Sequence, residues 1–574
     1  MLDAGHPKIA LKRFPLRSRI TLWFLLAVCA VPALSQQPDP VLQSLKDELA
    51  RSMASFKSQS RPSYYLAYEL TDNRGYRLGA EYGVVTQSNE NRTRHLDVDL
   101  RVGEPRLDNT HPLRERGMGG EMSQFRQPIP IEDDPMALRT AIWAVTDRKY
   151  REALVRLSAV KANEQVKVRS EDPSGDFSAE PAARYLEDEK PFSFDPKQWE
   201  KKLADLTSVF STAEVDVGQA ELTAETETRR FVNSEGSELR MTQTLYRLVI
   251  QTSIKAADGM ELPVYRTFAA FTPEGLPGDA ELKAAFAEVL SDARKLKSAP
   301  LADAYTGPAI LSGRSSAVFF HEIFGHRVEA QRQKLEDEAQ TFKKKVNEAV
   351  LPADFSVFSD PTAKRMGNLE LVGYYPYDDE GVKGQRVTVV SHGVLKNFLT
   401  SRSPIENFPT SNGHGRRQQG YAVVARQSNL IVESSQTVSR AELKKLLIAQ
   451  IKQANKPYGL LFDDIEGGFT FTQRGLPNAF NVIPTMVYRV YPDGREELVR
   501  GVDLIGTPLI AFSKIVAADD DIGVFNGICG AESGWVPVSA ISPGILVSQI
   551  EVQRKEKSQS RPPLLPAPTQ PAGK

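Results

Sequence analysis

Two histidines and a glutamate lie within six consecutive residues of this chain. His321 and Glu322 are adjacent, and His326 follows five positions after His321. The whole sequence of 574 residues contains only 7 histidines, so this is an unusual concentration. Neutral imidazoles are common zinc ligands, and a glutamate beside a metal-bound water is the usual general base of a metallopeptidase. The segment predicts a hydrolytic metal site; the alternative is a buried helix carrying two ordinary histidines.

The spacing of the two histidines does not fit a regular helix. Side chains at i and i+4 share one helical face, whereas those at i and i+5 stand about 140° apart. A π-bulge or a kink would bring both rings to one ion, and Gly325 makes such a distortion easier. We therefore expect a distorted helix between His321 and His326, with a serine cap near Ser315 at its start.

A catalytic zinc site takes three protein ligands and keeps one position open for water. Cys529 is the first candidate for the third ligand, because the glycines around it permit close approach of the backbone. It is the only thiol left if Cys29 is removed with the N-terminal segment. A small buried core residue is the alternative for Cys529. His392, His414 and several carboxylates are the other candidates for the third ligand.

Two later segments are candidates for substrate binding. His414 precedes Arg416 and Arg417 in a glycine-containing loop, and guanidinium groups bind carboxylates and carbonyls. An exposed basic loop without such a role is the alternative. Gly467 and Gly468 predict either an open strand edge that an extended peptide joins or a bulge in an ordinary sheet.

The elements that must position these residues change in type near residue 300. Before it, helical periodicity is expected over 41–56, 136–162, 196–210 and 279–297, and strands over 64–70, 76–86, 95–102, 226–232 and 238–254. After it, the pattern is β-rich, with helices expected over 331–349 and 440–454. We predict an α+β fold with a mixed α/β domain over 36–300 and a β-rich domain over 301–552 that carries the metal-binding helix.

Composition and the chain termini bound the partners and the location. The net charge is −1, from 72 basic and 73 acidic residues, which gives no reason to expect nucleic acid as a partner. A basic segment followed by an apolar run over 20–34 predicts a signal peptide over 1–35, hence a periplasmic or secreted protein without a membrane span. A lipoprotein anchored at Cys29 is the alternative, which Val28 disfavours. Residues 553–574 are expected to be a disordered tail.

The motif around the histidines resembles the HExxxH helix of the TldD/PmbA family of metalloproteases. Further segments look like this family, in its order: 377–381, 393–398, 411–417, 467–468 and 527–530. The resemblance covers about 300–552 well and the N-terminal half more loosely, through 234–236. Two departures from the family are the signal peptide, since most members are cytoplasmic, and the long charged segment over 331–349.

The resemblance implies a set of roles and a two-domain TldD/PmbA-like fold. In that family two histidines and a late cysteine hold the metal and the glutamate is the base, which points to His321, His326, Cys529 and Glu322. It implies an active, TldD-type endopeptidase acting on short or unfolded polypeptides, with zinc as the expected metal; the ligand set also permits iron. It also implies a homodimer or a heterodimer with a related subunit. The rival hypotheses are an amidohydrolase of non-peptide amides, a non-catalytic peptide-binding or assembly subunit, and a structural metal site.

Overall fold

The structure is a computed structural model that describes residues 39–113, 127–166, 172–212, 214–474, 480–506 and 511–555. From Asp39 onward these residues form one compact unit that contains two large sheets. The expected signal peptide, with Cys29, and the tail beyond 555 lie outside the described residues. Across the described ranges, every helix is too short or too polar to cross a bilayer.

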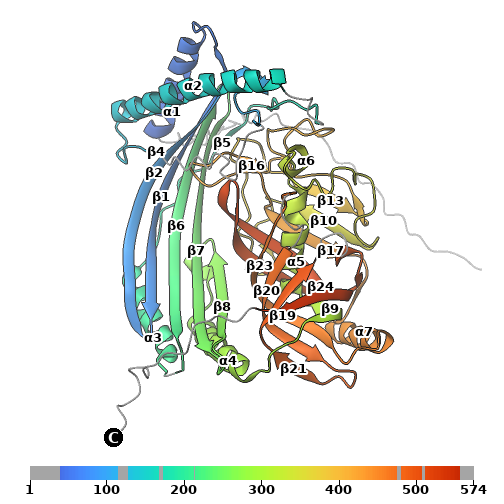
Figure 1. The fold of residues 1–574 in the computed structure, drawn as a ribbon. Coiled ribbons are helices and arrows are strands. Elements are labelled where there is room, and N and C mark those ends of the chain that lie inside the picture. The colour runs from blue at the N-terminus through green and yellow to red at the C-terminus, as the bar shows by residue number, and fades with distance from the viewer. Residues whose placement is uncertain are drawn as a thin grey trace, which may run out of the picture. The chain divides into compact units, whose positions relative to one another are not determined.

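An eight-stranded sheet is formed by the strands before residue 300, in the order β3-β2-β1-β6-β7-β5, with β4 beside β2 and β8 beside β7. Its long strands run side by side in Figure 1. The strands are β1 (Ser63–Glu81), β2 (Val84–Glu104), β3 (Leu107–Asp108), β4 (Gln127–Pro128), β5 (Arg184–Leu186), β6 (Val217–Asn233), β7 (Glu238–Lys255) and β8 (Glu261–Ala270). The helices of this half are α1 (Pro40–Phe56), α2 (Pro135–Val166), α3 (Pro196–Thr207) and α4 (Asp279–Ser298), with short 3₁₀ turns η1 (Ser208–Phe210) and η2 (Pro273–Gly275).

The two faces of this sheet have different surroundings, because side chains alternate along each strand. On one face, Leu66 near the start of β1 packs in the core beneath α1 and α2. Leu78, near the end of the same strand and on the same face, packs in the core beneath α3 and α4. The long strands thus carry helices at both ends of one face. The opposite face of β7, with Arg247 and Gln251, lines a large cavity instead.

A twelve-stranded sheet is formed by the strands after residue 300. Its members are β9 (Tyr305–Leu311), β10 (Phe355–Ser359), β13 (Val387–Ser391), β14 (Val394–Leu395), β17 (Asn429–Ser434), β18 (Thr437–Val438), β19 (Gly459–Thr470), β20 (Phe480–Val490), β21 (Glu496–Val499), β22 (Val502–Gly506), β23 (Ile515–Ala531) and β24 (Gly534–Arg554). Two small hairpins accompany it: β11 (Arg365–Met366) with β12 (Leu369–Glu370), and β15 (Gly415–Arg416) with β16 (Val424–Ala425). The helical elements are α5 (Gly313–Ile323), η3 (Gly325–Val328), α6 (Gln331–Lys334) and α7 (Arg440–Gln453).

Helix α5 lies within the core of this sheet, against β19, β23 and β24 (Figure 1). Phe319 and Phe320 are fully buried and make edge-on or stacked ring contacts with Phe480, Phe512 and Phe355. Burial of such large aromatic side chains is the strongest stabilising contribution available to a short helix. This packing therefore fixes the position of α5 and, with it, the position of His321 in its last turn.

The expected α+β class and the β-rich second half are confirmed. The predicted strand over 64–70 and most of the one over 76–86 form one continuous strand, β1, and residues 84–86 begin β2 after a turn. The change from one sheet to the other falls between α4 and β9, and the domain boundary near residue 300 stays a prediction.

The expectation of a helix over 331–349 is wrong beyond α6. The backbone of Gln340 and Asn347 has positive φ, and Glu338 and Ala349 make isolated β-bridges to Gln473 and Val394. A buried ion pair between Arg332 and Glu338 also holds this charged segment in place. Tertiary contacts thus override the helical propensity of the segment.

Candidate metal centre

The helix that carries the first histidine ends before the second one. Helix α5 stops at Ile323, Phe324 caps it, and the 3₁₀ turn η3 begins at Gly325. His321 therefore lies in the last turn of α5 and His326 in η3, with ring centroids 5.0 Å apart. This confirms the predicted distortion between the histidines, in the form of a helix end followed by a tighter turn.

Gly325 is required by a close approach and not by an unusual backbone angle. Its φ is not positive, but a methyl group there would collide with the side-chain amide of Gln427. Gln427 Nε2 donates a hydrogen bond to the carbonyl oxygen of His321 over 3.2 Å. The missing side chain at Gly325 thus lets Gln427 reach the last turn of α5.

Cys529 completes a cluster with the two histidines, although it follows them by more than 200 residues. It lies on β23, and its Sγ is 3.3 Å from Nε2 of His321 and 3.3 Å from Nε2 of His326. All three side chains are buried, and their ligand atoms lie within 4.8 Å of one another. Ligands of a tetrahedral zinc ion are about 3.5 Å apart, given bonds of about 2.0–2.3 Å. The donor types and their spacing fit such an ion.

A buried carboxylate supports the second histidine from behind. Glu329 is fully buried, and its Oε2 lies 3.3 Å from Nδ1 of His326 and accepts from Nε of Arg332 over 2.9 Å. Burial by itself would raise the pKa of Glu329, but His326 and Arg332 lower it to about 2. An ionised carboxylate on the distal nitrogen of a ligating histidine fixes the ring and its tautomer. The i, i+3 spacing of His326 and Glu329 is a signal that could have revealed this pair from the sequence.

A buried arginine supports the cysteine in a similar way. Arg426 Nη2 donates to the carbonyl oxygen of Cys529 over 2.8 Å and lies 3.2 Å from its Sγ. Burial would raise the pKa of the Cys529 thiol, but His326, His321 and Arg426 hold it well below its usual value. The cluster thus favours a thiolate, which is the form that binds metals. No sequence pattern marks Arg426.

Glu322 lies beside the three donors. Its Oε2 is 3.9 Å from Nε2 of His326, and burial raises the pKa of its carboxyl group. Gly468 on β19 makes room for it, since a methyl group there would lie 2.8 Å from Cγ of Glu322. The structure therefore brings together the four residues His321, Glu322, His326 and Cys529.

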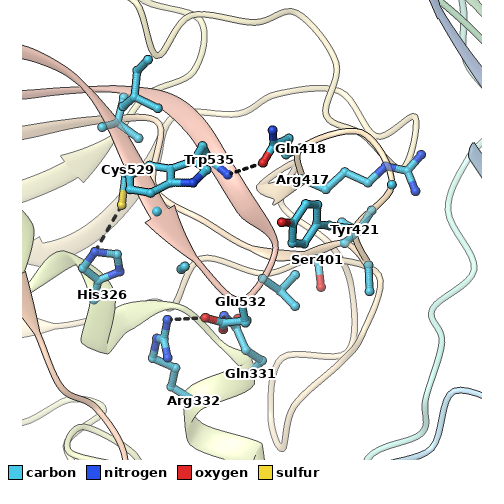
Figure 2. Close-up of a pocket in the computed structure, with 18 of the residues that line it drawn as sticks. His326, Gln331, Arg332, Ser401, Arg417, Gln418, Tyr421, Cys529, Glu532 and Trp535 are labelled. Carbon is cyan, nitrogen blue, oxygen red and sulfur yellow. Dashed lines mark hydrogen bonds and ion pairs between the residues drawn. The ribbon is translucent and has the colours of Figure 1, made fainter. Parts of the chain in front are cut away.

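These residues form part of the wall of a cavity of about 2640 Å³. The close-up in Figure 2 shows Cys529 and Trp535 of the β23–β24 hairpin on one side, with Arg417 and Tyr421 across from them. Gly467, Gly468 and Arg417, three of the predicted substrate-binding residues, also line this cavity.

His414 and Arg416 are placed elsewhere. His414 is completely buried, with Nε2 3.0 Å from Ser359 Oγ and Nδ1 3.0 Å from Asn412 Oδ1, and burial lowers its pKa to about 3. Arg416 is buried over the Tyr375 ring. Neither residue lines the cavity. The alternative of an exposed basic loop is wrong for His414 and Arg416, because both side chains are buried and hydrogen-bonded inside the protein.

The edge of β19 that carries the two glycines has no partner strand beyond residue 462 among the described strands, although the carbonyl oxygens of Asp463 and Ile465 accept from side chains. On one side Gly467 and Gly468 pair with Ile483 and Val482 of β20. On the other side β19 pairs with β9 only over residues 460–462, among the described strands. The backbone near Gly467 thus presents an edge next to Glu322.

Comparison with known proteins gives a family match and several related metalloproteases. Residues 304–554 match the PmbA/TldA metallopeptidase C-terminal domain. A metalloprotease of Archaeoglobus fulgidus is 30% identical over 41% of this chain and 51% of its own length. The metalloprotease TldD homolog of Haemophilus influenzae is 26% identical over 44% of the chain and 50% of its own length, and the zinc metalloprotease TldD homolog of Saccharolobus solfataricus is 25% identical over 44% and 53%. The matches thus span about half the length of these relatives.

Solved structures share the fold over most of the chain. TldE from Thermococcus kodakarensis superposes with a TM-score of 0.59 at 12% identity, covering 89% of this chain and 100% of its own. A candidate modulator of a DNA gyrase from Thermotoga maritima superposes with a TM-score of 0.58 at 17% identity, over 88% and 99%. At these identities the likeness establishes the fold alone. Residues 304–554 of this chain thus belong to the family of PmbA/TldA metallopeptidase C-terminal domains.

Proposed function

We propose that this protein is a metal-dependent endopeptidase that hydrolyses short or unfolded polypeptides. The observation that carries the proposal is the convergence of three metal donors and a buried glutamate on the wall of one large cavity. His321, His326 and Cys529 would hold zinc, or iron, with Glu329 and Arg426 holding two of these donors in place. Zinc held in this way acts as a Lewis acid and makes water a nucleophile near neutral pH.

Glu322 is assigned the role of general base. Its carboxylate is next to the donors but is not one of the three clustered atoms, so it is available to take a proton from the attacking water. Burial raises its pKa, which suits it to hold that proton and deliver it to the leaving amine. The proton therefore moves from water to Glu322 and then to the nitrogen of the cleaved bond.

The open edge of β19 is the proposed docking site for the peptide. An extended chain that pairs with the backbone at Gly467 and Gly468 would place a carbonyl group beside Glu322. Of the predicted pair Arg416 and Arg417, only Arg417 lines the cavity. Its guanidinium donates a hydrogen bond to Glu69 over 3.2 Å. A folded substrate has no free extended segment to offer such an edge, so the proposal favours unfolded polypeptides.

The test compares metal content and peptide hydrolysis of the full chain with those of Glu322→Gln. The variant should keep its metal and lose hydrolysis of an unfolded reporter protein and of a short peptide. Normal cleavage by a metal-loaded Glu322→Gln protein would refute the assigned base. Cleavage of small amides with no peptide turnover would favour the amidohydrolase alternative.

We extend the proposal to assembly and location. The resemblance to the TldD/PmbA family motivates a proposed dimer, either of two copies or with a related subunit. Light scattering of the purified protein, alone and co-expressed with related chains from the same source, tests this point. The N-terminal segment supports export, which N-terminal sequencing of the mature protein tests; a mature protein that retains residues 1–35 would contradict it.

A further inference from the structure

Arg247 lies on β7 and lines the same cavity as the metal donors. Its neighbours Leu248 and Ile250 are fully buried in the core on the helix-covered side of the sheet. Alternation along the strand therefore directs Arg247 to the other face. Gln219 and Gln251 lie on that face too and make the wall around Arg247 polar.

The guanidinium of Arg247 makes no hydrogen bond or ion pair with any residue that the structure describes, and its Nε is buried without an acceptor. Glu221 on the neighbouring strand β6 pairs with Arg77 instead, over 3.6 Å. Burial lowers the pKa of Arg247, and the charge of Glu221 partly offsets this effect. Leaving the buried Nε of Arg247 without an acceptor costs free energy, which a bound anion would offset.

Other basic residues of this cavity differ from Arg247. Every other arginine or lysine of the described cavity wall makes a polar or charged contact within the chain. Arg332, for example, binds Glu329 over 2.9 Å, and Arg417 binds Glu69 over 3.2 Å. Arg247 is thus singled out within the described part of the wall.

Its position relative to β19 is suited to a bound peptide. Arg266 of β8 binds Asp464 of β19 over 2.5 Å, next to the register pair Gln251 and Tyr265. Arg247 lies four residues along β7 from Gln251, which is about 13 Å of strand. A peptide that leaves the open edge of β19 would cover this distance with about four extended residues.

We infer that Arg247 binds a carboxylate of the peptide substrate, and so selects peptides that carry one a few residues from the cleaved bond. The inference rests on the proposed peptidase function. Arginine is suited to this role because its planar fork binds a carboxylate through two parallel hydrogen bonds. The carboxylate has two sources, the C-terminus of a short peptide or the side chain of Asp or Glu.

Binding of matched peptides to the zinc-loaded full chain tests the inference. One pair of fluorescein-labelled hexapeptides differs only in a free or amidated C-terminus, and a second amidated pair ends in Glu or Gln. We expect the carboxylate member of at least one pair to bind about 10–100-fold more tightly, as measured by fluorescence anisotropy. Arg247→Gln should abolish the difference, and Arg247→Lys should keep part of it.

The matched control is Arg151→Gln, which removes the same charge from an exposed residue of the cavity rim that pairs with Asp147 over 3.0 Å. It should keep the preference for the carboxylate peptide. A preference in the first pair assigns the C-terminus, and one in the second assigns an acidic side chain. Equal affinities within both pairs, or a preference that survives Arg247→Gln, would overturn the inference.

Cleavage is followed separately by mass spectrometry. A protein that prefers the carboxylate peptides but cleaves none of them would refute the proposed function and leave the inference intact. A protein that cleaves all four peptides without preference would refute the inference about Arg247 and leave the proposed peptidase function intact.

Discussion

The guanidinium of Arg426 lies 3.2 Å from the sulfur of Cys529, and both residues are buried. Arg426 Nε is also 3.5 Å from Glu329, the carboxylate behind His326. The buried guanidinium of Arg426 therefore contacts both Cys529 on β23 and Glu329, the carboxylate that holds His326 of η3. It links the two halves of the donor cluster without being a donor itself.

Replacing Arg426 with Met should weaken zinc binding by about 10–100-fold, the usual effect of losing a residue that supports metal ligands. The thiolate loses its hydrogen bond and Glu329 loses a neighbouring charge. Competition with a chromogenic chelator measures the affinity. Arg440→Met, at an exposed site, is the control. An Arg426→Met protein that folds and binds zinc as tightly as the control would contradict this role.

Gly468→Ala should lower kcat by about 100-fold while zinc stays bound, because the added methyl group displaces Glu322. Gly467→Ala is the matched comparison, since a methyl group at Gly467 has no atom within 4 Å. Its kcat should fall far less, with any effect of blocked peptide pairing seen in KM. Steady-state kinetics separates the two parameters, and equal losses of kcat would refute the steric argument.

Gly325→Ala should destabilise the fold by about 1–3 kcal/mol, as overpacking of a tight site does, and should weaken zinc binding. The methyl group collides with Gln427. The double variant Gly325→Ala/Gln427→Ala removes the collision and should recover part of both losses. Urea unfolding and chelator competition on the four proteins of this cycle measure the coupling. Additive losses would mean that the collision is not the cause.

Glu380→Gln should change the pH dependence of stability. Burial raises the pKa of Glu380 from 4.5 to about 7, so the folded chain binds a proton between these values that the unfolded chain has released. Stability is therefore lost as pH rises from 4.5 to 7, by up to about 3 kcal/mol for this group. The variant cannot ionise, yet it can still accept from the backbone N–H of Arg402.

We expect Glu380→Gln to exceed the wild type in stability at pH 8 and to lose this advantage near pH 5, as measured by urea unfolding. Glu433→Gln, at an exposed site, serves as the control and should show no such trend. A difference between Glu380→Gln and wild type that stays constant with pH would contradict the prediction.

The sequence allowed the helix break to be predicted, because the i, i+5 spacing of His321 and His326 cannot serve one ion from a regular helix. The long hairpin of β6 and β7 was also predictable from its turn and alternation. Strand β23, which carries Cys529, was not: three consecutive aspartates and several glycines hide its pattern. Its pairing with β24 comes from contacts that no local signal encodes.

The surroundings of the site were harder to predict than the donors. Glu329 contacts its sequence neighbours His326 and Arg332, but Arg426 acts through contacts with Cys529 and Glu329 about 100 residues away, which a single sequence does not reveal. His414 was expected in a substrate-binding loop, with an exposed basic loop as the alternative, yet its polar atoms form hydrogen bonds inside the protein. Polarity alone does not predict exposure where a hydrogen-bond network is complete.

The separation of Cys529 from His326 by 203 positions has a consequence for biosynthesis. An ion held by both residues would close a loop of that length, as a disulfide does. It would stabilise the fold by lowering the conformational entropy of the unfolded chain. The full donor set does not exist until β23 has left the ribosome. Metal capture must therefore be a late event, after most of the two sheets have been made.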